Sequence, residues 1–147
     1  MKKLTAFIKN LFYPTKARAE ATRLTRNLTK YNLIEDEIIA AIEARAHLKP
    51  GFGMSQLSQE TGVPYHHLTA YFNYYLGITF NDWKNNLRIE YIIDQFVQGR
   101  TQYLTMETLA REAGFLSRSN FVDSFKKKMG MNPSHYLNLL IKEKNVK

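Results

Sequence analysis

An internal repeat is the feature that most limits how this chain can fold. Leu57 and Gly62 recur 52 residues later as Leu109 and Gly114. With one extra residue allowed in the second copy, the offset becomes 53, and four further positions correspond: Leu68, Phe72, Gly77 and Trp83 match Phe121, Phe125, Gly130 and Tyr136. Self-similarity of this kind indicates that one supersecondary unit is present twice.

Each copy has the pattern of two helices joined by a tight turn. A helix of about two turns ends at a glycine, and a second helix follows, over 65–75 in the first copy and 119–129 in the second. Ser55 and Thr105 are the predicted caps of the two short helices. The apolar positions leave one face of each second helix free, as a helix that enters a DNA groove requires.

The remaining segments also show helical periodicity, with no alternation of period two that would predict strands. Pro14 should end a first helix over 2–12, and further helices are expected over 15–30 and 34–48. The predicted fold is all-α and homeodomain-like, with two helix-turn-helix subdomains, a long linker helix and extra N-terminal helices. The predicted bounds are 1–33 for an N-terminal segment or linker, 34–142 for the domain, about 54–76 and 105–129 for its two subdomains, and about 80–98 for the linker helix.

The net charge of +8 is concentrated at the two ends of the chain. Residues 1–30 carry +7, residues 31–100 carry −3, and residues 101–147 carry +4. Attraction to phosphate should therefore come from the ends. Residues 2–12 also form an amphipathic basic pattern, which is compatible with DNA phosphates, an anionic membrane surface, or docking on a sensor domain or second copy. We favour docking or a linker role for this segment.

Several function classes lack the residues that they need. The chain has no cysteine, and its histidines lack the spacing and acidic neighbours of a metal site: His47, His66, His67 and His135. There is no Gly-rich phosphate loop, no carboxylate pair placed for acid–base chemistry and no nucleophile constellation. We expect no enzyme activity, cofactor or metal. Because no run approaches the roughly 18 apolar residues of a membrane span, a soluble, cytoplasmic protein is expected.

The second copy resembles a known family. It contains the segments LAREAGF at 109–115, SNF at 119–121 and FKKKMGMNPSHY at 125–136. These segments are similar to the signature of the AraC/XylS family of bacterial transcription regulators. The resemblance covers about 54–136, and the first copy and linker helix share it through Leu68, Phe72, Gly77, Phe80, Trp83 and Arg88. Two positions depart from the family pattern: Ser58 stands where the family usually has alanine, and Ile92 stands where it usually has a small residue.

The resemblance implies a sequence-specific DNA-binding regulator that inserts two recognition helices into successive major grooves. It also implies double-stranded DNA and RNA polymerase as partners, with activation of transcription as the output. In the family, such a domain normally follows a sensor or effector domain, which these residues do not include. A second function class stays open, namely a protein-interaction module of a larger regulator with secondary DNA contact.

The second recognition helix has the stronger candidates for DNA contact. Arg118 can pair in a bidentate manner with guanine, and Asn120 can read adenine or hold a phosphate. Ser117 and Ser119 are candidates for helix capping or for phosphate contact. Asp123 should repel phosphate or accept from a cytosine amine.

A run of lysines ends this helix, and Lys126 and Lys127 are expected to neutralise phosphates if they do not simply face solvent. The first recognition helix has no lysine or arginine, and its candidates are Tyr65, His66, Thr69 and Asn73. We therefore expect the second copy to anchor on DNA and the first to adjust sequence preference.

Overall fold

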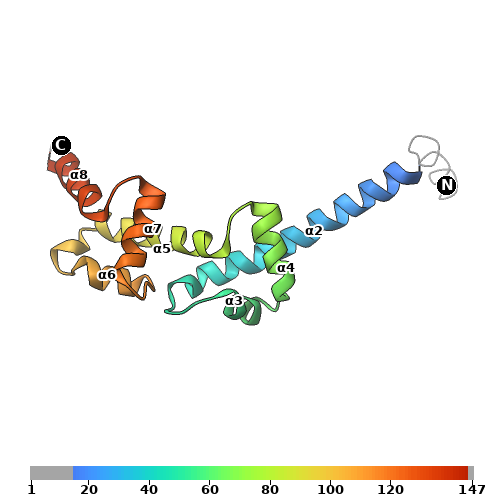
Figure 1. Ribbon diagram of the computed structural model, residues 1–147, viewed down its shortest axis with the longest axis horizontal. Coiled ribbons are helices and arrows are strands. Elements are labelled where there is room, and N and C mark those ends of the chain that lie inside the picture. Colours follow the sequence, from blue (N-terminus) through green and yellow to red (C-terminus); the bar gives the residue numbers. More distant parts are fainter. Residues whose placement is uncertain (1–14, 146–147) are drawn as a thin grey trace. The chain divides into compact units, whose positions relative to one another are not determined.

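The computed structural model describes residues 15–145, and every regular element in that range is helical (Figure 1). The elements are α2 (Thr15–Glu43), the 3₁₀ turn η1 (Ala46–Leu48), α3 (Met54–Thr61), α4 (Tyr65–Ala70), the π-helical turn η2 (Tyr71–Leu76), α5 (Phe80–Val97), the 3₁₀ turn η3 (Arg100–Gln102), α6 (Met106–Glu112), α7 (Arg118–Met129) and α8 (Pro133–Asn145). The all-α prediction is confirmed. No helix within residues 15–145 is long and apolar enough to cross a membrane.

The N-terminal helices differ from the prediction. The segments expected to be helical over 15–30 and 34–48 are largely so. Their separation into two helices is wrong, because α2 continues through Tyr31, Asn32 and Leu33, none of which is a helix breaker. The helix ends at Glu43, and Arg45 then takes a left-handed backbone conformation with φ of 56° before η1. The predicted helix over 2–12 lies outside the described residues. The chain divides into two compact parts between Asp36 and Glu37, and both helix-turn-helix units belong to the second part.

The first helix-turn-helix unit consists of α3, the turn at Gly62, α4 and η2. Leu57, Leu68 and Phe72 are completely buried, and the ring of Phe72 lies 5.0 Å from that of Trp83 on α5. The cap predicted at Ser55 is wrong, since α3 already begins at Met54 and Gly53 precedes it. Ser58 compensates for its polarity by donating a hydrogen bond from Oγ to the carbonyl oxygen of Val63 at 2.7 Å.

The second helix of this unit is not a uniform α-helix. The helix predicted over 65–75 changes at Tyr71 into the wider π-helical turn η2, which Gly77 ends with a φ of 65°. This turn accompanies the burial of two adjacent aromatic side chains, Tyr71 and Phe72, whose rings meet edge to face at 5.6 Å. π-Helical turns are rare and often occur at functional sites.

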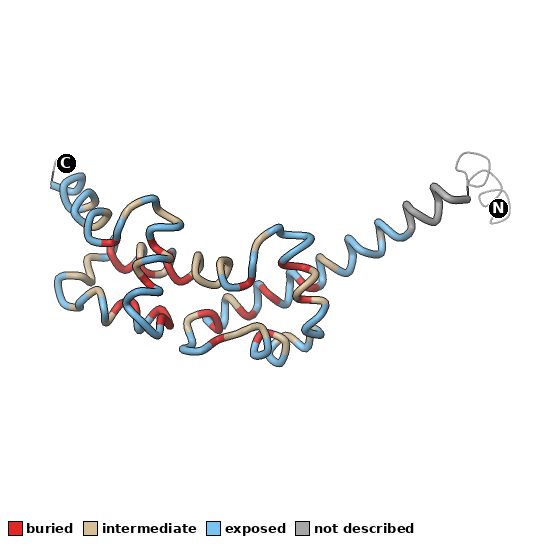
Figure 2. The backbone as a smooth tube through the Cα atoms, viewed as in Figure 1, coloured by how far each residue is buried: buried red, intermediate tan, exposed pale blue. Residues whose placement is uncertain are grey.

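The second helix-turn-helix unit consists of α6, the turn at Gly114 and α7. Thr105 caps α6 as predicted, because its side chain accepts a hydrogen bond from the backbone N–H of Thr108 at 3.1 Å. The buried residues of α5, α6 and α7 form one core where the three helices meet (Figure 2). Ile92, the departure in the linker helix, is completely buried in this core.

Arg88 on α5 connects the two units. Its guanidinium donates from Nε to the carbonyl oxygen of His47 at 2.8 Å and from Nη2 to that of Lys49 at 3.0 Å. On the side of the second unit, the same group lies 5.6 Å from the centre of the Phe115 ring. Arg88 is therefore a buried contact between the segment that leads into the first unit and the turn of the second.

Candidate nucleic-acid interface

The second recognition helix, α7, is held by its cap and by two buried aromatic rings. The Ser117 side chain accepts from the backbone N–H of Asn120 at 3.2 Å, so Ser117 is the N-cap. Phe121 and Phe125 lie in the core. Because these contacts fix one face of α7 against the protein, the opposite face, with Ser119, Asp123 and Lys126, is presented to solvent.

Arg118, the predicted reader of guanine, has an acidic neighbour that the sequence did not indicate. Its Nη1 lies 3.3 Å from Oε1 of Glu107, which belongs to the first turn of α6. The two side chains keep 78% and 48% of their exposure. An ion pair this exposed is weak, so Arg118 can exchange Glu107 for another acceptor at small energetic cost. Glu107 resembles an ordinary first-turn acid in the sequence, which is why the pair was missed.

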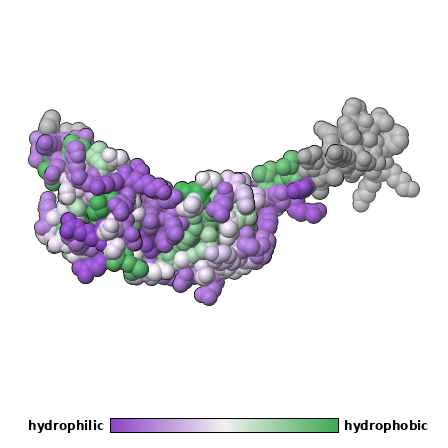
Figure 3. All heavy atoms as spheres, viewed as in Figure 1, coloured by the Kyte–Doolittle hydropathy of each residue, from purple (hydrophilic) through white to green (hydrophobic). Residues whose placement is uncertain are grey.

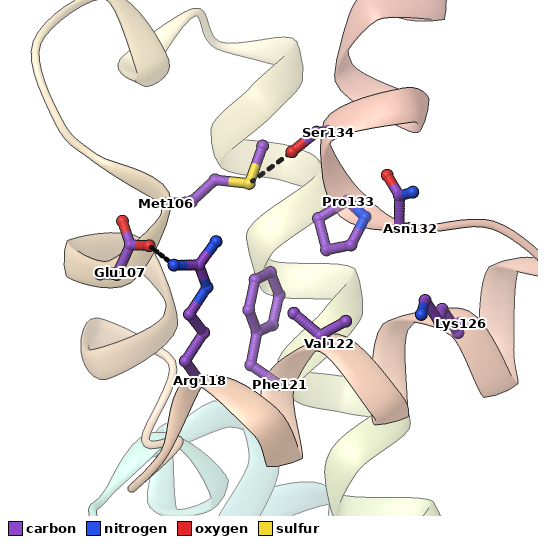
Figure 4. A pocket seen from close by; sticks show the side chains of 9 residues that line it. All are labelled: Met106, Glu107, Arg118, Phe121, Val122, Lys126, Asn132, Pro133 and Ser134. Atoms are coloured by element: carbon purple, nitrogen blue, oxygen red, sulfur yellow. Dashed lines mark hydrogen bonds and ion pairs between the residues drawn. The ribbon is translucent and has the colours of Figure 1, made fainter.

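A cavity of about 310 Å³ opens beside Arg118, and Figure 4 shows its side chains. Arg118 and Glu107 point toward one another at one side, and Lys126 lies on the other side beyond Val122. The start of α8 forms part of the wall, where Asn132 caps the helix by accepting from the N–H of His135 at 2.8 Å. Two cations and a helix start around one cavity form an environment suited to an anion.

The three lysines at the end of α7 are in different situations. Lys127 donates to Oδ1 of Asp82 and Lys128 to Oε1 of Glu90, both at 2.6 Å, so both are tied to α5. The hydrogen bond from Lys127 is the main reason why the pKa of Asp82 lies below its ordinary value. Lys126 is exposed and lines the cavity. Of the two lysines predicted to contact phosphate, Lys126 is therefore the better placed.

The polar residues near the start of α7 contact one another. Ser119 does not cap the helix, and its hydroxyl lies 3.4 Å from Oδ2 of Asp123, one turn further on. Asn120 uses its backbone N–H in the cap, which leaves its side-chain amide at the exposed surface. Both hydrogen-bond donors and hydrogen-bond acceptors are therefore available on this face of α7.

The candidates of the first unit lie on α4 and η2. Tyr65, His66 and Asn73 are exposed, whereas Thr69 is half-buried and donates its hydroxyl proton to the carbonyl oxygen of Tyr65 at 3.0 Å. The ring of His66 lies 4.2 Å from that of its neighbour His67. The fifteen residues from Gly62 to Leu76 contain no lysine or arginine, so this face can offer hydrogen bonds and aromatic surface but little attraction to phosphate.

The two units therefore present different surfaces. Hydrophilic side chains cover much of the visible face of the second unit, interrupted by small apolar patches (Figure 3). Within residues 15–145, no three His, Cys, Asp or Glu side chains lie close enough together to hold a metal ion.

Comparison with known proteins agrees with this geometry. The sequence model of a helix-turn-helix domain family, of the AraC type, matches residues 57–138, which is more than half of the chain. No curated protein and no solved structure matches the chain. The matched range includes most of the first unit, all of α5 and the whole second unit.

Proposed function

Because this chain belongs to the AraC/XylS family of DNA-binding transcription regulators, we propose that α7 anchors it on promoter DNA while α4 adjusts the sequence preference. The observation that carries this proposal is the exposed α7 surface, where Arg118 and Lys126 flank an open cavity. No comparable cation lies on α4 or η2.

On DNA, each unit contributes according to its chemistry. Arg118 leaves Glu107 and pairs with a guanine, with Asn120 and Ser119 beside it in the same major groove. Lys126 neutralises phosphate, Lys127 contributes less because it is paired with Asp82, and Ser117 keeps its capping role. Tyr65, His66, Thr69 and Asn73 contact the next major groove, about one helical turn (~34 Å) along the duplex.

We further propose that binding recruits RNA polymerase and activates transcription in the cytoplasm, with a sensor or effector domain as a separate partner and no catalytic activity. The family supports these roles as the usual output of such a domain. A promoter fused to a reporter gene, with and without the protein, measures whether transcription rises or falls.

Selection of bound duplexes from a random pool tests the anchoring role directly. The selected site should contain one strongly preferred half, and Arg118→Ala should weaken binding to it by about 1–3 kcal/mol while relaxing the preference at one base pair. Equal losses on selected and random duplexes would remove Arg118 from base reading.

One observation favours a protein-interaction role for the first unit. Tyr74, on the π-helical turn, keeps 84% of its exposure, and Leu76 nearby is also exposed. Aromatic and apolar side chains that stand in solvent are common where proteins dock. A gel shift across a salt series separates the two functions, because a DNA binder shows a steep linear dependence of log affinity on log salt.

A further inference from the structure

A second cavity, of about 490 Å³, lies where the two helix-turn-helix units and α5 meet. Its walls come from the segment 51–53 that leads into α3, from one side of α5, and from residues 115–124 of the second unit. All three walls belong to the same compact part of the chain. A molecule in this cavity would therefore touch both units at once.

Two cations line this cavity: Arg88 is buried and Lys84 is half-buried. Lys84 donates from Nζ to the carbonyl oxygen of Phe52 at 2.9 Å and lies 5.5 Å from the centre of the Phe80 ring. Burial, followed by repulsion from Arg88, lowers the pKa of Lys84 below its ordinary value. Arg88 is 4% exposed. An incoming anion would relieve the repulsion between these cations and meet ammonium protons that Phe52 does not use.

Neutral donors complete the lining. Asn81 and Asn85 on α5 and Asn120 on α7 also line the cavity. Asn85 already donates to Oγ of Ser124 at 3.1 Å, which fixes the orientation of its amide. Amide donors beside a lysine are the usual contacts of phosphate oxygens in proteins.

The carboxylate of Asp123 opposes this attraction. It is exposed and also lines the cavity, while Ser119 lies 3.4 Å from one of its oxygens. The charged residues of the lining are thus two cations and one anion. Asp123 should weaken anion binding without abolishing it. Removing its charge should therefore strengthen anion binding, whereas removing the charge of Lys84 should weaken it.

We propose that this cavity is an anion site for a phosphate group, with Lys84 as the contact cation, and that its occupation sets the spacing of the two recognition helices. The phosphate comes from one of two sources, the DNA backbone between the two major grooves or a free phosphorylated compound. The first source rests on the proposed DNA-binding function, and the second does not.

Titration of the free full-length protein with inorganic pyrophosphate, at constant ionic strength, tests the site without DNA. In amide NMR spectra, Gly53, Leu116 and Asn120 should shift in a saturable way. Lys84→Gln should lower the affinity about tenfold, and Lys84→Arg should retain it. Asp123→Asn should raise it roughly twofold to fivefold. Lys142→Gln, which removes an exposed lysine on α8, is the matched control.

Linear, unsaturable shifts in the wild-type protein would overturn the proposal, and this outcome does not depend on any variant folding. Saturable shifts that Lys142→Gln weakens as much as Lys84→Gln would overturn it too, because binding would then reflect net charge alone. Since Lys84 also holds the Phe52 carbonyl group, circular dichroism and thermal unfolding are recorded for each variant.

A second measurement identifies the source of the phosphate. Neutral methylphosphonate groups are placed one at a time along the DNA between the two half-sites. If the backbone occupies the cavity, one of these groups should weaken binding of the wild-type protein about tenfold but not that of Lys84→Gln. If a free compound occupies the cavity, pyrophosphate should change the affinity for DNA. In that case no methylphosphonate position should affect the wild-type protein and Lys84→Gln differently. A failed gel shift combined with saturable pyrophosphate binding would reject the DNA function and keep the site.

Discussion

The guanidinium group of Arg88 donates a hydrogen bond from Nε to the carbonyl oxygen of His47 at 2.8 Å, across 41 residues of sequence. The same buried group reaches the carbonyl of Lys49 and the ring of Phe115, so it contacts the approach to the first helix-turn-helix unit and the turn of the second. α5 is therefore a clamp as well as a linker.

Gly114 packs closely against Leu48 and Arg88. Its φ is +89°, and an added Cβ would lie 2.5 Å from the carbonyl oxygen of Leu48 and 2.8 Å from Nη2 of Arg88. Gly114→Ala should therefore lower the free energy of unfolding by more than about 2 kcal/mol, measured by urea denaturation.

Gly130→Ala is the matched control for this substitution. Gly130 also has a positive φ, of +72°, but an added Cβ would meet nothing within 4 Å. Its cost should be the backbone strain alone, about 1 kcal/mol. Equal losses of unfolding free energy in the two variants would show that the steric contact at Gly114 adds nothing to the backbone strain.

His47 should make stability depend on pH. Burial, then repulsion from Arg88 and Arg45, lowers its pKa below the ordinary value of 6.5, and its buried Nδ1 has no hydrogen-bond partner. The unfolded chain then binds more protons than the folded one between the two pKa values. Stability from this group is complete above the unfolded pKa, declines as the pH falls through 6.5, and levels off below the folded pKa.

The measurement is the urea midpoint between about pH 8 and about pH 5. His47→Gln should flatten the decline near the unfolded pKa, because glutamine does not titrate. His135→Gln, at an exposed position, should leave the decline in place. A decline that survives in His47→Gln would have to come from another group.

Glu107 should restrain DNA binding through Arg118. Glu107→Gln removes the charged partner of the ion pair, and affinity should rise by roughly 0.2–1 kcal/mol, the range of exposed pairs. The measurement is a gel shift in the wild-type and Arg118→Ala backgrounds. If the gain persists without Arg118, Glu107 acts by repelling phosphate over a distance and not through the ion pair.

Lys126 and Lys127 should contribute unequally to phosphate contact. Lys126→Ala should weaken binding to all sequences alike and reduce the salt slope by about 1. Lys127→Ala should have a smaller effect on both quantities, because Lys127 is paired with Asp82 in the free protein. Salt series on specific and random duplexes measure the two slopes. A larger loss for Lys127 would mean that it leaves Asp82 on DNA.

Much of the fold could be predicted from the sequence, because the signals involved are local. The repeat of glycines and apolar residues predicted two helix-turn-helix units, and the cap at Thr105 and the extent of α5 agree closely with the structure. The errors arose where local signals compete. Ser55 is a good capping residue, but Gly53 occupies the N-cap position of α3, and no breaker separates the segments that form α2.

The candidate site was predicted less completely. Arg118 and Lys126 could be placed on α7 from helical periodicity, since spacing alone decides which face they share. The acidic partners of Arg118 and Lys127 could not be predicted, because Glu107 and Asp82 approach α7 only after α5, α6 and α7 have packed together. The place of Lys84 in the second cavity could not be predicted either, since in the sequence it is only one charge on an amphipathic helix.

Three properties can be read from the linear chain: it is helical, it carries one unit twice, and its positive charge belongs to the second copy and not the first. These properties follow from residue type and spacing, which the linear chain already contains. Which of the positive charges remain unpaired in solvent depends on how the helices pack. Lys127 and Lys128 are bound to α5, Arg88 is buried in the clamp, and Lys126 remains in solvent. These differences arise from contacts between residues distant in sequence, whose distances are set by packing.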